Sequence, residues 1–315
     1  MKRIATTLLL LSAAVAAQAQ GVTPAIKDVV AAGTSIELIK EGFQGTEGPI
    51  TLPDGSAIFT ETQANRITRI AADGSTAAFL EDTNGANGLA FNKSGELVAV
   101  ITGKPSIAVI YPKNKARVLV DSYQGKSLGR PNDLVVDKQG GVYFTDPGPN
   151  APAGQPAPIS PPATAVYYLS PAGELHLLDA TVPRPNGIQL SPDEKTLYVN
   201  NTWGEYVLAY DIKKDGAVGA RRDFAKLQGF RKTDTGTSSG ADGLAVDAKG
   251  NVYVASTDGV QVFTKQGEAL GVIALPKAPQ NLAFAGPGKK VLYVVGRGSA
   301  WRINTQTSGY AGRAK

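Results

Sequence analysis

Residues 130–137 read Arg-Pro-Asn-Asp-Leu-Val-Val-Asp, and residues 184–191 read Arg-Pro-Asn-Gly-Ile-Gln-Leu-Ser. Each stretch is followed by a turn and then by an alternating run, Val-Tyr-Phe-Thr-Asp at 142–146 and Leu-Tyr-Val-Asn-Asn at 197–201. A polar residue, a short apolar strand, a turn and a second strand therefore recur together. The two stretches are copies of one repeating unit.

The same unit occurs six times along the chain, and each copy begins with an acidic or amide residue. We call these residues the anchors; they are Glu47, Asn87, Asn132, Asn186, Asp242 and Asn281. Subtracting successive anchor positions gives spacings of 40, 45, 54, 56 and 39 residues, and a four-stranded propeller blade takes about 40–50 residues. The repeat predicts an all-β fold, a six-bladed β-propeller. A β-sandwich is the alternative, but sandwiches do not normally repeat a polar residue at this spacing.

The sixth unit is one strand short, because the chain continues for few residues beyond the apolar run at 300–304. The β-rich residues 35–39, Ser-Ile-Glu-Leu-Ile, precede the first anchor and have no unit of their own. We expect this N-terminal strand to pair into the last blade and close the ring, which removes the sheet edges that an open array would expose.

The N-terminus has the features of a secretory signal. Lys2 and Arg3 precede an apolar run over residues 4–17, and Ala17-Gln18-Ala19 has the small-x-small form of a cleavage site. About 14 apolar residues are too few for a membrane-spanning helix, which needs roughly 20. We predict a signal peptide at 1–19, a single propeller domain at 20–315, a periplasmic or secreted location, and no membrane association after cleavage.

Composition excludes several kinds of function. The chain has no cysteine, which rules out thiol catalysis and cysteine metal sites, and its formal charge of +5 is scattered rather than clustered, which argues against nucleic-acid binding. The one histidine, His176, lies in a predicted outer strand, so a Ser-His-Asp triad is disfavoured. Residues 286–290, Gly-Pro-Gly-Lys-Lys, lack the spacing of a phosphate-binding loop.

In a propeller the first strand of each blade is innermost, so the anchors are expected to converge at one mouth of the axial channel. Glu47, Asn132, Asn186 and Asp242 offer carboxylate and amide oxygens, a set suited to Ca²⁺, with Mg²⁺ or Mn²⁺ as alternatives. Zn²⁺ prefers nitrogen and sulfur ligands and is the least favoured alternative. Another interpretation is that the anchors only cap strand starts; it suits Asn87 and Asn281 but does not explain the two acidic copies.

At these residues the chain resembles the regucalcin and gluconolactonase family, the senescence marker protein/gluconolactonase/luciferin-regenerating enzyme-like proteins. The stretches that carry the resemblance begin at Glu47, Arg130, Tyr143, Pro185, Ser191, Leu197, Asp242 and Gly250. The resemblance implies a six-bladed propeller with a catalytic divalent cation bound by Glu47, Asn186 and Asp242. It places Asn132 beside the ion, as ligand or substrate contact, and Arg130 against the substrate. Glu61 stands where the family commonly has aspartate.

The sequence therefore predicts a secreted metal-dependent lactonase, in which an activated water attacks the carbonyl of a small sugar lactone. Asp242 is the candidate general base, and Glu47 is the second catalytic residue. A phosphotriesterase or other esterase on the same site, and a non-catalytic binding module, are the alternatives. Two long links, 147–164 and 226–241, are expected to rise over the anchor mouth, the first as a lid or a disordered insertion. The native metal, the preferred lactone and the oligomeric state are left open.

Overall fold

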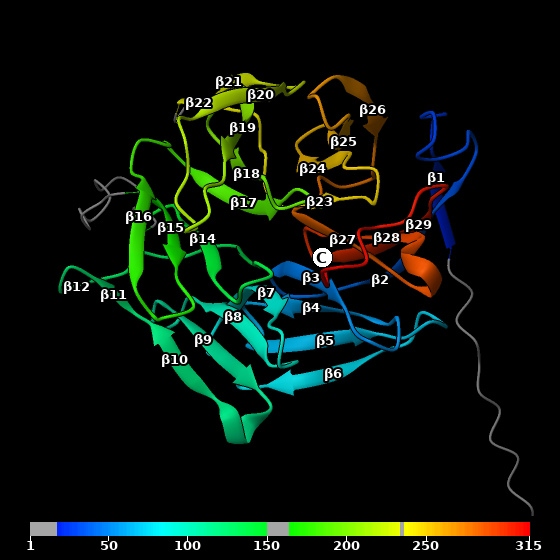
Figure 1. The fold of residues 1–315 in the computed structure, drawn as a ribbon. Coiled ribbons are helices and arrows are strands. Elements are labelled where there is room, and N and C mark those ends of the chain that lie inside the picture. Colours follow the sequence, from blue (N-terminus) through cyan, green and yellow to red (C-terminus); the bar gives the residue numbers. More distant parts are fainter. Residues whose placement is uncertain (1–17, 150–163, 234–235) are drawn as a thin grey trace, which may run out of the picture.

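A computed structural model of the chain describes residues 18–149, 164–233 and 236–315. Over these residues the regular secondary structure is all β-strand apart from two short 3-10 turns, η1 (Lys113–Lys115) and η2 (Pro287–Lys289). Six antiparallel sheets of four or five strands surround a central axis (Figure 1). The predicted six-bladed propeller is confirmed. No helix within these ranges is both long and apolar enough to cross a membrane.

Each blade starts at the axis with the strand that carries its anchor and adds strands outward. From the axis outward, the strands of blades 1 to 3 are β3 (Thr46–Thr51), β4 (Ala57–Glu61), β5 (Arg66–Ile70) and β6 (Thr76–Glu81); β7 (Ala86–Phe91), β8 (Leu97–Ile101), β9 (Ser106–Tyr111) and β10 (Arg117–Val120); and β13 (Leu134–Val136), β14 (Val142–Asp146), β15 (Ala165–Leu169) and β16 (Leu175–Asp179). Those of blades 4 and 5 are β17 (Pro185–Leu190), β18 (Thr196–Asn201), β19 (Tyr206–Asp211) and β20 (Arg222–Lys226); and β23 (Leu244–Val246), β24 (Val252–Ser256), β25 (Gly259–Phe263) and β26 (Ala269–Ile273).

Blade 6 is built from both ends of the chain. Its strands are β27 (Asn281–Ala285), β28 (Val291–Gly296), β29 (Ser299–Asn304), β2 (Ser35–Glu41) and β1 (Gln18–Val22). β2 pairs antiparallel with β29, with Leu38 opposite Trp301, which confirms that the N-terminal strand closes the ring. β1 was not expected, and it begins before the predicted cleavage point at Gln20. Residues 1–17 of the predicted signal lie outside the described residues.

The apolar core lies between the blades rather than inside any one of them. In the described ranges the buried apolar side chains form six clusters, one at each blade-to-blade interface. Between blades 5 and 6, for example, the rings of Tyr253 and Phe284 meet edge-to-face at 5.0 Å. Inner strands such as β25 are buried on both faces, because each is covered by a neighbouring blade on either side, whereas the outermost strand β6 is largely exposed.

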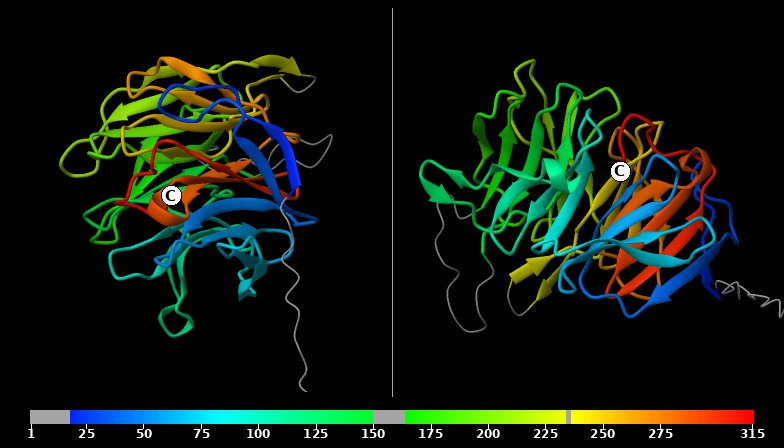
Figure 2. Two further views of the ribbon diagram at one scale, coloured as in Figure 1. Left: turned by 90° about the vertical axis from the view of Figure 1, so that its right-hand side faces the viewer. Right: turned by 90° about the horizontal axis from the view of Figure 1, so that it is seen from below.

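The ring has two distinct faces. A short hairpin of β21 (Arg231–Thr233) and β22 (Gly236–Ser238) lies on one side, and the C-terminal segment lies on the other (Figure 2). Another hairpin, β11 (Ser122–Tyr123) with β12 (Lys126–Ser127), leads from blade 2 to blade 3. The first of these hairpins is followed by Ser239, whose backbone N–H donates to Thr202, next to anchor Asn186. The described residues of the 226–241 link therefore border the anchor face, as predicted.

Candidate metal centre

The anchors lie where the innermost strands begin. Four of them lie inside the strand rather than just before it, because pairing with the second strand continues past the anchor; Glu47, for example, lies opposite Thr60. Asn132 and Asp242 each precede their strand by two residues. The innermost strands of neighbouring blades contact one another around the whole ring, from β3 through β27 and back to β3. The six anchors thus surround one axis.

Glycine follows the anchor in blades 1, 2, 4 and 5 because neighbouring blades leave no room there for a side chain. A Cβ on Gly187 would lie 2.3 Å from the carbonyl oxygen of Asp242, and one on Gly48 would lie 2.1 Å from the carbonyl oxygen of Asn87. The Gly187 N–H instead donates to that Asp242 oxygen at 3.0 Å. The missing side chain lets the backbones of adjacent anchors touch.

Glu47 and Asp242 place two carboxylates in the same buried region. Burial raises the pKa of Glu47 to about 7. A hydrogen bond of 3.1 Å from the side-chain amide of Asn281 partly opposes this rise. Burial also raises the pKa of Asp242 well above its ordinary value, and the charge of Glu47 raises it further. Blades 1 and 5 therefore bring together two acids that repel each other when both are ionised.

The amide of Asn186 is held so that its oxygen has no partner. Its Nδ2 donates to Thr202 Oγ1 at 3.0 Å, and that hydroxyl donates onward to the carbonyl of Ala241 at 2.7 Å. The backbone of Asn186 is fixed as well, since its carbonyl accepts from Thr145 Oγ1 at 2.6 Å. Asn186 Oδ1 is buried without a hydrogen bond to any described residue.

Asn186 Oδ1 is one of several buried acceptors in this state around the axis. Within the described ranges, the anchor region holds unpartnered buried oxygens on Asn87, Asn186, Asn200 and Asp242. A buried acceptor without a donor is costly, and a cation would satisfy several at once. No three His, Cys, Asp or Glu side chains among the described residues group as a metal site. Amide oxygens would have to complete the ligand set, and this all-oxygen chemistry fits a hard divalent cation such as Ca²⁺.

Asn87 and Asn281 behave differently, although the capping interpretation seemed to suit both. Asn281 Oδ1 accepts from the N–H of Leu282 at 2.9 Å, and its Nδ2 holds Glu47, so it is a satisfied cap. Asn87 Nδ2 donates to the carbonyl of Asn132 at 2.9 Å, but its Oδ1 belongs to the unpartnered set. Asn132 itself is half-buried and is tied to blade 2 through its backbone.

The arginine of each Arg-Pro-Asn stretch lies close to the same region. The Arg130 N–H donates to Asp146 Oδ1 at 2.8 Å, which fixes the loop before Asn132. Burial lowers the pKa of Arg184, the charge of Arg130 lowers it further, and Asp242 opposes the shift. The Arg184 guanidinium lies over the half-exposed ring of Trp203, 5.4 Å from its centroid. Two guanidinium groups and an accessible indole thus border the anchors.

Sequence reasoning missed Arg184, Asn200 and Asp133. Arg184 occupies the same place in the second Arg-Pro-Asn stretch as Arg130 does in the first, so the duplication itself was the signal. Asn200 lies in the second strand of blade 4 rather than at the start of a first strand, where the anchors recur, and its Nδ2 donates to the Asp242 carbonyl at 2.6 Å. Asp133 occupies the position after the anchor, which is glycine in four other copies, and this departure from the repeat was the signal.

His176, Glu61 and the link at 147–164 lie outside the anchor set. His176 is half-exposed on outer strand β16, as expected. Glu61 is fully buried and bound by Arg66, with Nε to Oε1 at 2.8 Å, and by Thr68 at 2.5 Å, so it is a structural ion pair rather than part of the anchor set. Most of the proposed lid, residues 150–163, lies outside the described residues.

Known proteins share both the sequence pattern and the fold. A family model described as the SMP-30/gluconolactonase/LRE-like region matches residues 45–297. The chain belongs to this family. The gluconolactonase of Zymomonas mobilis is 30% identical over 308 residues, covering 91% of this chain and 86% of that protein. A regucalcin from Pongo abelii is 28% identical over 211 residues, covering 65% of this chain and 67% of that protein.

Solved structures of the SMP-30/gluconolactonase/LRE-like family superpose over nearly the whole chain. A gluconolactonase from Xanthomonas campestris has a TM-score of 0.79 at 29% identity, covering 91% of this chain and 96% of that one. The family match spans all six anchors, from Glu47 to Asn281, and the duplicated Arg-Pro-Asn stretches. The resemblance inferred from the motifs is therefore confirmed.

The metal-free protein is expected to lose stability as the pH rises from about 4.5 to about 7. The ordinary pKa of Glu47 is 4.5, so the unfolded chain releases this proton first while the folded chain keeps it up to about pH 7. The folded state binds more protons in this window, so the free energy of unfolding falls, by about 3 kcal/mol from Glu47 alone. Urea unfolding in chelator at pH 5 and pH 7.5 measures it. A fall of equal size in Glu47→Gln would contradict the assignment.

Proposed function

We propose that this chain is a metal-dependent hydrolase that opens the ester of a sugar lactone. The observation that carries the proposal is the pair of mutually repelling carboxylates, Glu47 and Asp242, surrounded by buried amide oxygens that have no partner. No hydrogen-bond donor among the described residues satisfies these amide oxygens, and a divalent cation would satisfy them. The gluconolactonases of Zymomonas mobilis and Xanthomonas campestris support the substrate class.

The residues that would hold the cation are Glu47, Asn186 and Asp242, with Asn132 beside it. When bound, a divalent cation of this kind polarises an ester carbonyl and lowers the pKa of water. We expect Ca²⁺, because the donors are all oxygen; Mg²⁺ and Mn²⁺ suit the same donors, and Zn²⁺ fits them least.

Asp242 is proposed as the general base. Its buried Oδ1 has no hydrogen-bond partner among the described residues, so it is available to accept a proton from an attacking water. Its carbonyl is held by Gly187 and Asn200, which fixes the backbone from which the carboxylate projects. Glu47, held by Asn281, would keep the opposite side of the site negatively charged.

Arg130 and Asn132 are proposed to orient the sugar hydroxyls. Both lie in the loop before β13, which Asp146 fixes by accepting the N–H groups of Gly129 at 2.7 Å and Arg130 at 2.8 Å. Arg184 with Trp203 would form a second wall of the substrate site, because a flat, half-exposed indole suits a sugar ring. The small-molecule lactone is the proposed partner.

The proposed location is periplasmic or secreted, on the basis of the signal-like residues 1–19 alone. Expression of the full chain with N-terminal sequencing of the exported product tests this directly. A mature protein beginning near Gln20 is expected. Retention of residues 1–19 in a cell-associated product would contradict it.

Turnover of a panel of substrates tests the proposed reaction. We expect aldonolactones to be hydrolysed by the purified protein, with activity lost in excess chelator and restored by Ca²⁺. Phosphotriesters and simple aryl esters serve as the competing substrates, because the same cation site is suited to attack at phosphorus. Faster turnover of phosphotriesters would change the substrate class, and chelator-resistant lactone hydrolysis would remove the metal from the mechanism.

A further inference from the structure

The C-terminal segment, residues 305–315, crosses the face of the ring opposite the anchors and is tied to several blades. The Ala314 carbonyl accepts from Thr51 at 2.7 Å in blade 1, and the Gly309 N–H donates to Lys289 at 2.8 Å in blade 6. The Ser308 carbonyl accepts from Ala248 at 2.8 Å in blade 5. These backbone bonds fix the path of the segment across the axis (Figure 1).

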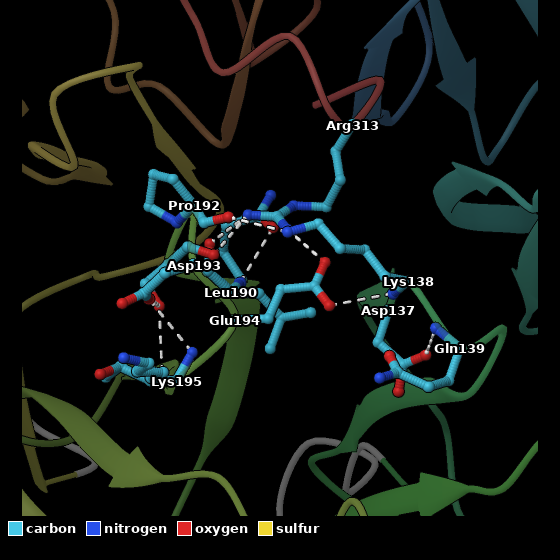
Figure 3. A network of polar contacts seen from close by, with 12 residues as sticks. Asp137, Lys138, Gln139, Leu190, Pro192, Asp193, Glu194, Lys195 and Arg313 are labelled. Carbon is cyan, nitrogen blue, oxygen red and sulfur yellow. Dashed lines mark hydrogen bonds and ion pairs between the residues drawn. The ribbon is translucent and has the colours of Figure 1, made fainter. Parts of the chain in front are cut away.

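Arg313 ties the same segment to blade 4. Its Nη2 donates to the carbonyl of Leu190 at 2.6 Å, and its Nη1 forms an ion pair with Glu194 at 3.0 Å, with both side chains largely buried. Glu194 also accepts from the N–H of Lys138 at 3.0 Å in blade 3 (Figure 3). Because Arg313 is bonded to blade 4, and through Glu194 to blade 3, the C-terminal segment has little freedom to move at its last residues.

Lys315 then points into the ring and forms a buried ion pair with Asp133. Its Nζ lies 2.5 Å from Asp133 Oδ2, and the two side chains are only 5% and 1% exposed. The other oxygen of Asp133 accepts the N–H of Leu134 at 2.9 Å. Residues 313–315 and the innermost strands of blades 2, 3 and 4 enclose a cavity of about 20 Å³. The ammonium therefore lies among the strands that line the axis.

This ion pair is within electrostatic reach of the anchors. Asp133 directly follows anchor Asn132, and its Oδ1 would lie 2.5 Å from a Cβ on Gly88, the residue after anchor Asn87. In line with this placement, the charge of Asp133 contributes to raising the pKa of both Glu47 and Asp242, after burial, and the charge of Lys315 opposes the rise at Glu47. Three carboxylates thus share the interior of the ring when all are ionised. A divalent cation would add two positive charges to this region, and Lys315 already places one positive charge beside Asp133.

We propose that Lys315 is a built-in cation of the metal centre, which neutralises Asp133 from the opposite face and so sets the affinity of the anchors for a divalent ion. The inference rests on the proposed metal dependence, not on the lactone chemistry. Neither Lys315 nor Asp133 belongs to the anchor set. Both are therefore positioning residues, which act on the anchors through their charge. A buried lysine costs desolvation unless it is paired, and Asp133 supplies that partner.

Calcium titration of the full chain by calorimetry, after chelation and dialysis, tests the proposal. Lys315→Met removes a positive charge and is expected to tighten Ca²⁺ binding about tenfold, whereas Asp133→Asn removes a negative charge and is expected to weaken it about tenfold. The double variant restores the charge balance and should bind within about threefold of the wild type. Lys315→Arg keeps the charge and is the matched control. A purely structural pair would not shift affinity in opposite directions.

Several outcomes would overturn the proposal. Unchanged or weakened Ca²⁺ binding in a folded Lys315→Met protein, judged by near-UV circular dichroism, contradicts it. If that variant does not fold, an unchanged affinity in Asp133→Asn contradicts it equally. A wild type that binds no divalent cation removes both this inference and the metal centre. A wild type that binds Ca²⁺ but does not hydrolyse lactones removes only the proposed reaction.

Discussion

Asp242→Asn is expected to lower lactone turnover by about 1,000-fold, because an amide can neither accept the proton of an attacking water nor contribute charge to a bound cation. The substitution keeps the size of the side chain, so the propeller should stay folded. In the metal-free protein it removes the charge that Glu47 and Asp133 oppose, and stability should be equal to or higher than that of the wild type. Steady-state kinetics and urea unfolding measure the two effects.

Asp211→Asn is the control for this substitution. Asp211 ends β19, the third strand of blade 4; its side chain is 79% exposed and pairs only with surface Arg222 among the described residues, so its loss should change neither turnover nor stability appreciably. Glu47→Gln is expected to reduce turnover about 100-fold through weaker cation binding. Asp242→Asn turnover within tenfold of the wild type would exclude Asp242 as the general base.

Gly187→Ala is expected to destabilise the protein by about 3 kcal/mol and to lower turnover with it. The new Cβ would lie 2.3 Å from the Asp242 carbonyl oxygen and 2.8 Å from the Cα of Gly243, and neither backbone atom can move alone. Blades 4 and 5 would have to separate at the axis, which displaces Asn186 from Asp242. Thermal unfolding and calcium titration report on the two consequences.

Gly219→Ala provides the matched control. A Cβ at Gly219 would lie 3.6 Å from its nearest neighbour, the Asp211 carbonyl oxygen, which is ordinary contact. Its stability should stay within about 0.5 kcal/mol of the wild type. Equal stability of the Gly187→Ala and Gly219→Ala proteins would show that the axis is more compliant than the described geometry allows.

The sequence repeat alone determines most of the fold. Anchor spacing predicted the number of blades. Residues 35–39 predicted the closing strand, because the sixth blade lacked one strand, these residues belonged to no blade, and pairing the two accounts for both. Strand β1 was not predicted, since Gln18 and Ala19 lie in a stretch that reads as a cleavage site. These residues are compatible with both a cleavage site and a β-strand, and the local sequence does not show which of the two prevails.

The anchor residues could be selected from the sequence because repetition aligns them, and a polar residue at each blade start has to face the axis. The chain by itself thus determined the blade count and the closure, and it predicted a set of candidate oxygen donors that includes Glu47, Asn186 and Asp242. Only the tertiary structure showed that Asn200 bonds the carbonyl of Asp242 and that Lys315 reaches Asp133, 182 residues away, from the opposite face. Such contacts depend on how distant segments are placed by packing between blades, and no local pattern encodes that distance.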